Sequence, residues 1–351
     1  MSNLRLLLFP VSLIYAGIIR VRNLLFDKKI LESRVYHIPL ICVGNLKIGG
    51  AGKTPFTELL IRMLGAENNI ATLSRGYGRS TRGMLMAGFP ADSLMVGDEP
   101  AQFKNKFPSM PVCVAEDRRE GITSLIESGV KLIILDDAFQ HRRVNCGLKI
   151  VLIEYSDLFK QVIALPAGNY REPLSSLYRS SMVVITKSAN AITAEGKAKI
   201  REFLRLPGSI PLYFSTLVYE QPVPVFKAPA LSLPSWDSTQ KVILITGIAN
   251  PVPLLEYLRS RGLTVIHQQY VDHHNFTYQD IVKLSAIFEA KNTRATMVLT
   301  TEKDAQRLKI PQLLQIASIL PFYYLPIRAE IIQADKKEFE SFIFEYVNSA
   351  L

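Results

Sequence analysis

Cysteine is scarce in this sequence, with only Cys42, Cys113 and Cys146 among 351 residues. The three lie far apart, in or beside apolar runs, and no CxxC pair or Cys/His cluster occurs. Small secreted folds depend on patterned cysteines, and zinc sites depend on clustered Cys and His. The sequence therefore indicates neither a disulfide framework nor a zinc site, and a reducing cytoplasmic compartment fits it best.

Repeats and low-complexity segments are also missing. Apolar residues make up 48% of the chain and charged residues 21%, which is ordinary globular usage and excludes wholesale disorder. The length allows two domains. The formal net charge of +10 favours anionic partners, namely nucleotides, nucleic acid, anionic lipid head groups or a phosphorylated substrate, without choosing among them.

The N-terminus lacks an uncharged run of membrane-spanning length. Residues 6–19 carry no charge, but these fourteen residues fall short of the roughly 20 that cross a bilayer as a helix. A signal peptide needs a small-residue cleavage site after the run, where the sequence IIRVR stands instead. A plain core helix is the remaining alternative to attachment at a membrane surface.

Over residues 1–34 we favour an amphipathic helix that attaches, peripherally or monotopically, to the cytoplasmic face of a membrane. The segment has six Lys or Arg against Asp27 and Glu32, an excess of four positive charges. Apolar residues recur at helical spacing, and basic ones can reach anionic head groups. The apolar positions are Leu4, Leu8, Val11, Tyr15, Ile18 and Leu25, and the basic ones are Arg5, Arg20, Arg22 and Lys28.

The segment IPLICVGNLKIGGAGKTPFTELLIRML joins an apolar strand to a helix through a glycine-rich loop. In a loop of this kind, backbone N–H groups and the helix N-terminus surround phosphate oxygens, Lys53 reaches the β- and γ-phosphates, and the Thr54 hydroxyl binds Mg²⁺. A glycine-rich turn with an accidental GKT is the alternative, since Lys47 replaces the first glycine. We predict an ATP cradle formed by Lys47, Ile48, Gly49, Gly50, Ala51, Gly52, Lys53 and Thr54.

Short apolar runs alternate with helical patterns from about residue 38, which predicts a parallel sheet covered on both faces. Prolines gather between Pro207 and Pro234, and a second alternating series follows them. The expected fold class is α/β. It has a P-loop NTPase-like three-layer domain over 35–220, a linker over 221–238 and a smaller α/β domain over 239–351.

Two acidic pairs are candidates for chemistry at this sheet. Asp136 and Asp137 end the strand VKLIILDD, where an α/β sheet presents side chains to a ligand, and a carboxylate there can hold Mg²⁺. Asp98 and Glu99 precede a helix in LMVGDEPAQF. Asp98 is a candidate to accept a hydroxyl proton in phosphoryl transfer, although a plain helix cap is the alternative.

The second half of the chain contains one cluster of titratable residues, VDHHNF. Consecutive histidines point different ways, so Asp272, His273 and His274 form a poor metal cage, and a carboxylate–imidazole pair for proton transfer is more plausible. An Asx cap beside surface histidines is the alternative. In GNYREP, Arg171 can bind a phosphate or pair with Glu172, and the segment LTTEKDAQRL reads as a capped helix start.

Together these motifs resemble those of one family, the tetraacyldisaccharide 4′-kinases. The ordered set covers most of the chain and is far more specific than any single motif. Ala138 departs from the usual DDGFQ, while both carboxylates remain. After the N-terminal apolar helix, the matching segments are GNLKIGGAGKTP, LSRGYGR, VGDEP, ILDDAFQH, LPAGNYREP, VDHHNF and LTTEKDAQR.

The resemblance implies an ATP- and Mg²⁺-dependent kinase at the cytoplasmic membrane surface. Its substrate is an acylated glucosamine disaccharide 1-phosphate, phosphorylated at the 4′-hydroxyl to give lipid IVA. The family fold, two α/β/α domains joined by a short β linker, implies that the second domain closes over the first. By motif position, Asp98 and His273 are the catalytic dyad. The metal set is Thr54, Glu99, Asp136 and Asp137, and the substrate set is Arg75, Tyr77, Asn169 and Arg171.

Two rival classes predict features that the sequence lacks. A GTPase should carry an NKxD motif, of which ITKSAN is only a faint echo. A nucleic-acid-binding protein should concentrate its basic residues with aromatics on one face. Here they are spread, so no nucleic acid is expected as a partner. A membrane-associated P-loop NTPase without lipid-kinase activity is the remaining alternative.

Overall fold

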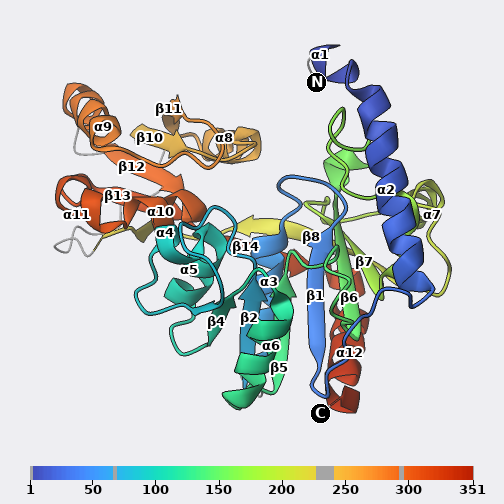
Figure 1. Cartoon of the computed structure of the whole chain (residues 1–351). Coiled ribbons are helices and arrows are strands. Elements are labelled where there is room, and N and C mark those ends of the chain that lie inside the picture. The colour runs from blue at the N-terminus through green and yellow to red at the C-terminus, as the bar shows by residue number, and fades with distance from the viewer. Residues whose placement is uncertain (1–2, 66–68, 227–240, 292–295, 351) are drawn as a thin grey trace.

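The computed structural model describes residues 3–65, 69–226, 241–291 and 296–350. It contains two β-sheets, each with its own helices, which Figure 1 shows side by side. The long N-terminal helix α2 lies at the outer edge of the larger unit in the same view.

The larger sheet has nine strands. Seven central strands pair in parallel, and an antiparallel strand closes each edge. Most of the parallel strands are buried along their whole length, which explains their continuous apolar sequences. Their spatial order is β14 (Ile327–Ile331), β8 (Leu212–Tyr219), β7 (Met182–Thr186), β6 (Leu148–Glu154), β1 (Leu40–Asn45), β5 (Leu132–Asp136), β2 (Ile70–Ser74), β4 (Val112–Val114) and β3 (Leu85–Met86).

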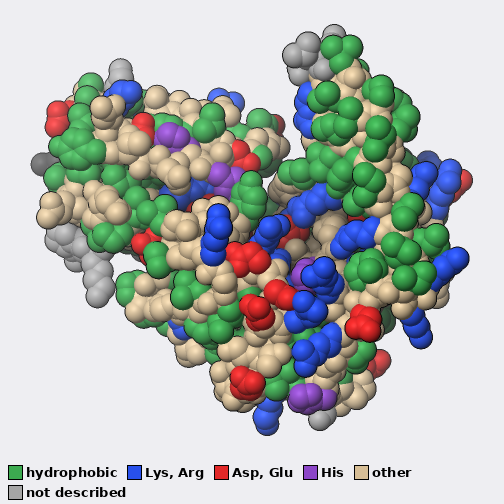
Figure 2. All heavy atoms as spheres, viewed as in Figure 1, with side chains coloured by type: hydrophobic (Ala, Val, Ile, Leu, Met, Phe, Trp, Pro, Cys, Tyr) green, Lys and Arg blue, Asp and Glu red, His purple; other side chains and the backbone are tan. Residues whose placement is uncertain are grey.

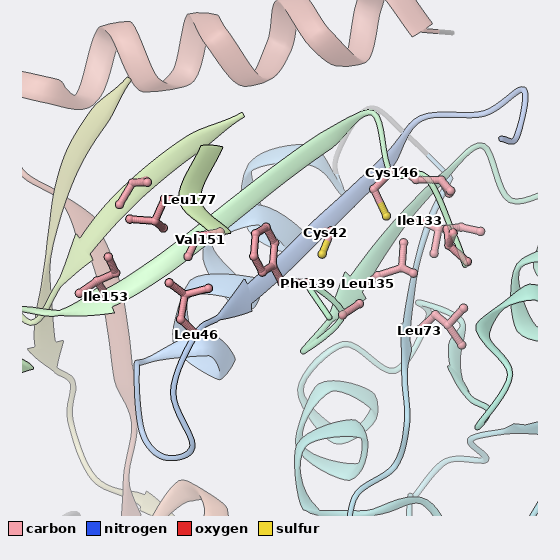
Figure 3. Packing of buried hydrophobic residues seen from close by; sticks show 14 of the residues in the cluster. Cys42, Leu46, Leu73, Ile133, Leu135, Phe139, Cys146, Val151, Ile153 and Leu177 are labelled. Carbon is pink, nitrogen blue, oxygen red and sulfur yellow. The ribbon is translucent and has the colours of Figure 1, made fainter. Parts of the chain in front are cut away.

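Helices cover both faces of this sheet, as the predicted three-layer fold requires. Side chains of β1 alternate between two hydrophobic clusters, one on each face. Figure 3 shows part of the first cluster, with Phe139 packed among strand residues and near the buried, unpaired Cys42 and Cys146. The covering helices are α3 (Lys53–Leu64), α5 (Asp98–Lys106) and α12 (Gln333–Ala350) on one face, and α6 (Arg118–Glu127) and α7 (Ala194–Phe203) on the other.

The smaller sheet has five strands, of which β9 is antiparallel. Its order is β11 (Thr264–Gln269), β10 (Lys241–Thr246), β12 (Thr296–Thr301), β13 (Phe322–Leu325) and β9 (Val223–Pro224). Its helices are α8 (Val252–Ser260) on one face and α9 (Tyr278–Lys291), α10 (Glu302–Leu308) and α11 (Pro311–Ala317) on the other. The short elements α4 (Ser93–Val96), η1 (Tyr155–Asp157) and η2 (Leu174–Arg179) lie in connections of the larger unit.

The expected range 239–351 for the second domain is wrong at its C-terminal end. β14 joins the larger sheet, and α12 packs on that sheet's core. Phe339 meets Phe56 edge to face at 6.0 Å between ring centroids, and the Tyr346 hydroxyl donates to the Leu40 carbonyl. Apolar periodicity predicts that a helix has a buried face but does not say which sheet buries it. The remaining boundaries stay predictions, and residues 227–238 of the expected linker lie outside the described residues.

The N-terminal segment forms α1 (Asn3–Leu6) and α2 (Phe9–Asp27). Within the described part of the chain, α2 alone is long and apolar enough to cross a membrane, and only 11% of its most apolar window is buried. This exposure argues against the core-helix alternative, while length and composition by themselves are weak evidence for a membrane.

The predicted apolar stripe of this segment mixes two faces of the helix. Leu8, Val11 and Ile18 are exposed as expected, but Tyr15 and Leu25 are only half-buried and turn toward the protein. The apolar side chains of α2 and of the turn before it that are at least half exposed are Leu7, Leu13, Ile14, Ile18, Val21 and Leu24. Figure 2 shows hydrophobic side chains covering the visible face of this segment. The burial of Leu4 lies outside the described residues.

Candidate active site

The phosphate loop connects β1 to α3, as the sequence predicts. Asn45 ends the strand, and Lys53 begins the helix, with Gly52 as its N-terminal cap. Gly52 has a φ of 77°, in the left-handed region that favours glycine, so this residue type is required at the turn. The backbone N–H groups of the first turn of α3 have no partners within the helix, so they can bind phosphate oxygens.

The two lysines of the loop have different partners. The Lys53 ammonium lies 3.3 Å from Asn45 Oδ1 and 3.6 Å from Asp137 Oδ1, at the mouth of the loop. Lys47, which replaces the usual glycine, pairs with Asp157 at 2.5 Å. Lys47 therefore anchors the start of the loop, while Lys53 is the cation placed to meet a phosphate. Thr54 follows in the first turn of α3 and is half-buried.

Asp136 and Asp137 lie at the carboxyl end of β5 in different environments. Asp136 is 4% exposed and accepts a hydrogen bond from Thr57 Oγ1 at 3.1 Å. Burial first, and then the neighbouring Asp137 charge, raise the pKa of Asp136 to about 7. Asp137 has a left-handed φ of 49° and pairs with Arg171 and Lys53.

This donor set fits Mg²⁺. A carboxylate as buried as Asp136, with little positive charge to offset it, is stabilised by a cation, and Mg²⁺ prefers carboxylate and hydroxyl oxygens together with substrate phosphates. Among the described residues, no group of three or more His, Cys, Asp or Glu could hold a metal ion. An ion here must therefore share its coordination with the nucleotide.

Asp98 and His273 meet across the two units. Asp98 begins α5 in the larger unit, and His273 follows β11 in the smaller one. His273 Nδ1 lies 3.1 Å from Asp98 Oδ2. Arg307, from α10, donates to the same oxygen through Nε and Nη2 at 3.0 and 2.6 Å. With Nδ1–H donating to Asp98, His273 Nε2 is free to accept from the Lys303 ammonium at 3.3 Å.

Ion pairs around the Asp98–His273 pair connect the smaller unit to the larger one. Lys303 pairs with Glu99 at 2.7 Å. Lys106 binds both the fully buried Glu58 of α3, at 2.8 Å, and Glu302 of α10, at 2.7 Å. The helix that begins at the cradle is thus tied to the helix that carries Lys303 and Arg307.

The other members of the VDHHNF cluster have local roles. His274 contacts Asp280 at 3.0 Å and stacks on Tyr270, while Asp272 is exposed. His274 therefore contacts residues of its own unit, and the geometry brings His273 to Asp98.

The four expected substrate residues are spread around the site. Tyr77 is exposed, and its ring lies 5.6 Å from that of His273. Arg171 pairs with Asp137, while Asn169 Oδ1 accepts from Arg5 of α1. Arg75 is exposed. The buried Arg118 has its pKa lowered to about 10, by burial first and by the Arg75 charge second. Tyr77 thus lies at the dyad and Arg171 at the carboxylates.

Sequence reasoning missed Arg307, Thr57 and Arg5 as site residues. Arg307 lies one helical turn after the TTEKD start of α10, and Thr57 lies one turn after Lys53 in α3. Positions one turn apart share a helix face, so this spacing is a signal that could have nominated both residues. Arg5 was expected to face lipid head groups, but its guanidinium binds Pro166, Gly168 and Asn169. Arg22 likewise donates to the Gln140 carbonyl.

The titration of Asp98 gives a test of this geometry. Burial raises the pKa of Asp98, but hydrogen bonds from His273 and Arg307 outweigh burial and hold it at about 2, below its ordinary 3.8. The ionised carboxylate therefore stabilises the fold above pH of about 4, and this contribution is lost as the pH falls toward 2. Asp98→Asn should remove about 2 kcal/mol of pH-dependent stability. Urea unfolding of both proteins at several pH values below about 5 measures it, and equal pH dependence would contradict the pairing.

Known proteins of one family are similar to this chain along almost its whole length. The family described as tetraacyldisaccharide-1-P 4′-kinase (LpxK) matches residues 4–348. A tetraacyldisaccharide 4′-kinase of Parabacteroides distasonis is 38% identical over 351 residues, covering 98% of this chain and 95% of that protein. A tetraacyldisaccharide 4′-kinase of Flavobacterium johnsoniae is 40% identical over 354 residues, covering 100% of this chain and 99% of that protein.

A solved structure has the same fold. The crystal structure of LpxK from Aquifex aeolicus in complex with ATP superposes with a TM-score of 0.74 at 26% sequence identity. The match covers 98% of this chain and 99% of that one, so it includes both units.

Proposed function

The chain belongs to the tetraacyldisaccharide-1-P 4′-kinase family, and from this membership we propose how its residues divide the reaction. The enzyme is a lipid A 4′-kinase. It uses ATP to phosphorylate the 4′-hydroxyl of a tetraacyldisaccharide 1-phosphate, which gives lipid IVA. The family and its ATP-bound relative support this activity over a membrane-associated P-loop NTPase without lipid-kinase chemistry.

On the donor side, the loop from Lys47 to Thr54 holds the phosphates of ATP. Backbone N–H groups at the start of α3 and the Lys53 ammonium neutralise the β- and γ-phosphate oxygens. Thr54, Asp136 and Asp137, with Glu99 nearby, would hold Mg²⁺ together with the ATP phosphates, and the ion would supply positive charge to those phosphates. Glu99 is included by its motif position, and in this structure its carboxylate pairs with Lys303 at 2.7 Å.

On the acceptor side, Asp98 receives the hydrogen bond of the 4′-hydroxyl and takes its proton as the oxygen attacks the γ-phosphate. The contact of 3.1 Å between His273 and Asp98 is the observation that carries this assignment, because it orients the carboxylate from the opposite unit. Arg75, Tyr77, Asn169 and Arg171 bind the disaccharide. The smaller unit closes over the cradle and excludes water, which limits ATP hydrolysis.

The test is incubation of the purified enzyme with γ-labelled ATP, Mg²⁺ and tetraacyldisaccharide 1-phosphate. The labelled product should be a bisphosphorylated lipid. Label released only as inorganic phosphate would support the rival NTPase instead.

We further propose that the N-terminal helix attaches the enzyme to the cytoplasmic face of the inner membrane. ATP is a cytoplasmic donor, the acceptor carries acyl chains, and α2 exposes a continuous apolar face. The net charge of +10 suits an anionic membrane and a substrate that already carries a phosphate.

Replacing exposed apolar residues of α2 should release the enzyme from membranes. Leu13, Ile14, Ile18 and Val21 are each at least 58% exposed, so their change to serine should leave the fold intact while removing several kcal/mol of lipid contact, at about 0.8 kcal/mol per buried CH₂. Cosedimentation with phospholipid vesicles measures the effect. The matched control changes Val271 and Ile319 of the smaller unit, which are 72% and 79% exposed, to serine. This control variant should still cosediment with the vesicles. Unchanged partitioning of the α2 variant would contradict the proposal.

A further inference from the structure

A loop of residues 163–172, called here the crossing loop, lies between the N-terminal helices and the phosphate loop. On the helix side, the Arg5 guanidinium makes four hydrogen bonds to it. Nε and Nη2 donate to the Pro166 carbonyl at 3.3 and 2.9 Å, Nη2 donates to the Gly168 carbonyl at 2.9 Å, and Nη1 donates to Asn169 Oδ1 at 3.1 Å. Arg5 thus binds three acceptors of one short segment.

Two further side chains of α2 continue this contact. Ser12 is 2% exposed, and its Oγ accepts a hydrogen bond from the Ala167 N–H at 2.9 Å. The Tyr15 hydroxyl donates to the Arg171 carbonyl at 3.2 Å. These polar side chains therefore face the crossing loop, whereas the exposed apolar side chains Leu13, Ile14 and Ile18 face away from the protein.

On its other side, the crossing loop pairs with the backbone of the phosphate loop. The Ile48 N–H donates to the Asn169 carbonyl at 2.8 Å, and the Arg171 N–H donates to the Leu46 carbonyl at 2.7 Å. Lys47 and Tyr170 form an antiparallel bridge between these bonds. The same segment carries the guanidinium that pairs with Asp137.

The crossing loop is too tightly folded to absorb a displacement. The Gly168 N–H bonds the Ala164 carbonyl at 2.8 Å, and the Tyr170 N–H bonds the Ile163 carbonyl at 3.1 Å. A Cβ on Gly168 would lie 1.9 Å from the Ile163 carbonyl oxygen. The crossing loop therefore forms a continuous hydrogen-bonded connection between the N-terminal helices and the phosphate loop.

We propose that Arg5 and Ser12 are positioning residues that make the geometry of the ATP cradle depend on how the N-terminal helix is seated on lipid. Little of α2 is buried in the protein, so its position is set jointly by these hydrogen bonds and by whatever its apolar face contacts. Lipid contact fixes the position of the helix, and the hydrogen bonds of Arg5 and Ser12 fix the crossing loop against the helix. Backbone pairing with the crossing loop then fixes residues 46–48 of the cradle. This inference rests on the proposed membrane attachment.

Coupling of this kind is reciprocal, because a membrane that improves nucleotide binding must itself be bound better when nucleotide is present. The enzyme is then most active where its acyl-chain substrate lies, and its affinity for ATP falls when it is detached.

The experiment compares four proteins: the wild type, Arg5→Ala, Arg5→Lys and Arg20→Ala. Arg20 is exposed on α2, and its side chain makes no hydrogen bond within the described residues, so Arg20→Ala matches the charge loss of Arg5→Ala without touching the crossing loop. The affinity of each protein for a non-hydrolysable ATP analogue is measured with Mg²⁺, in the presence and absence of vesicles of phosphatidylethanolamine and phosphatidylglycerol. Cosedimentation is measured in parallel, and the KM for ATP is measured on detergent-dispersed substrate.

Vesicles should raise analogue affinity at least about fivefold in the wild type and in Arg20→Ala, the low end of typical coupling between sites. In Arg5→Ala the vesicle-induced gain in analogue affinity should fall below about twofold, although the protein still cosediments with vesicles. The gain in Arg5→Lys should lie between those of Arg5→Ala and the wild type. Arg5→Ala should also raise the KM for ATP and leave kcat nearly unchanged, a split that a general loss of folding would not give. An equal vesicle gain in Arg5→Ala, or no gain in a wild type that sediments, overturns the coupling.

A wild type that does not sediment with vesicles overturns the membrane attachment separately. The positioning role is then decided by the KM for ATP in detergent. A KM raised in Arg5→Ala but not in Arg20→Ala upholds the role, and equal values overturn it.

Discussion

Asp98→Asn is expected to lower kcat for lipid phosphorylation by about 10²–10⁴-fold, the usual contribution of a positioned base. Asparagine keeps the shape of the side chain and can still meet His273, but it cannot take the proton of the 4′-hydroxyl. ATP affinity should stay within about twofold, because the cradle residues Lys53 and Thr54 lie on a different element of the fold. Steady-state kinetics and nucleotide titration measure the two quantities.

The matched control for this substitution is Asp272→Asn. Asp272 is an exposed carboxylate next to His273 in sequence, so its loss should leave kcat nearly unchanged. His273→Ala should give a smaller loss than Asp98→Asn, because His273 orients the base and does not itself receive the proton. Full turnover by Asp98→Asn would remove Asp98 from the mechanism.

Arg307→Ala is expected to destabilise the enzyme by about 3–5 kcal/mol and to lower kcat as well, because removing one partner of a buried ion pair leaves an uncompensated charge. Arg307 is 3% exposed in its side chain and pairs with Asp304, which is fully buried, and with Asp98. It also donates to the Gly247 carbonyl at 3.0 Å. Both the fold of the smaller unit and the position of the base thus depend on one guanidinium.

Urea unfolding and kinetics separate these two effects. Lys199→Ala is the control, since Lys199 pairs with Glu195 on the surface of α7 with both side chains well exposed, and such a pair is worth less than about 1 kcal/mol. In a double-mutant cycle, Arg307→Ala should cost less in the Asp98→Asn background than in the wild type. Additive losses would show that Arg307 acts on Asp304 alone.

Features carried by consecutive residues could be predicted from the sequence. The strand, glycine loop and helix of the cradle are one continuous segment, and α3 begins at Lys53, directly after the glycine loop, as the motif predicts. Asp136 was expected at the end of a strand and closes β5. Local patterns predict these features because hydrogen bonding within a turn or a strand end involves neighbours in the chain.

Contacts between distant residues could not be predicted from the residues alone. Arg307 and Asp98 are separated by 209 positions, and His273 and Asp98 by 175. Apolar periodicity gave α12 a buried face, but its place late in the chain put it in the wrong unit. Basic charge near an apolar run placed Arg5 at lipid instead of at the crossing loop. For α12 and Arg5 the residue type was read correctly and the partner was not, whereas the pairing of Asp98 with His273 was expected only through the family resemblance.

By itself, the sequence determined the phosphate loop, the chemical groups available for phosphoryl transfer and the family to which their order belongs. Only the tertiary structure decided that His273 rather than His274 faces Asp98, that Arg307 holds that carboxylate, and that Arg5 ties the N-terminal helix to the cradle. The physical reason is that loop conformation and helix starts depend on adjacent residues, whereas the partner of a charged side chain depends on how separate elements pack.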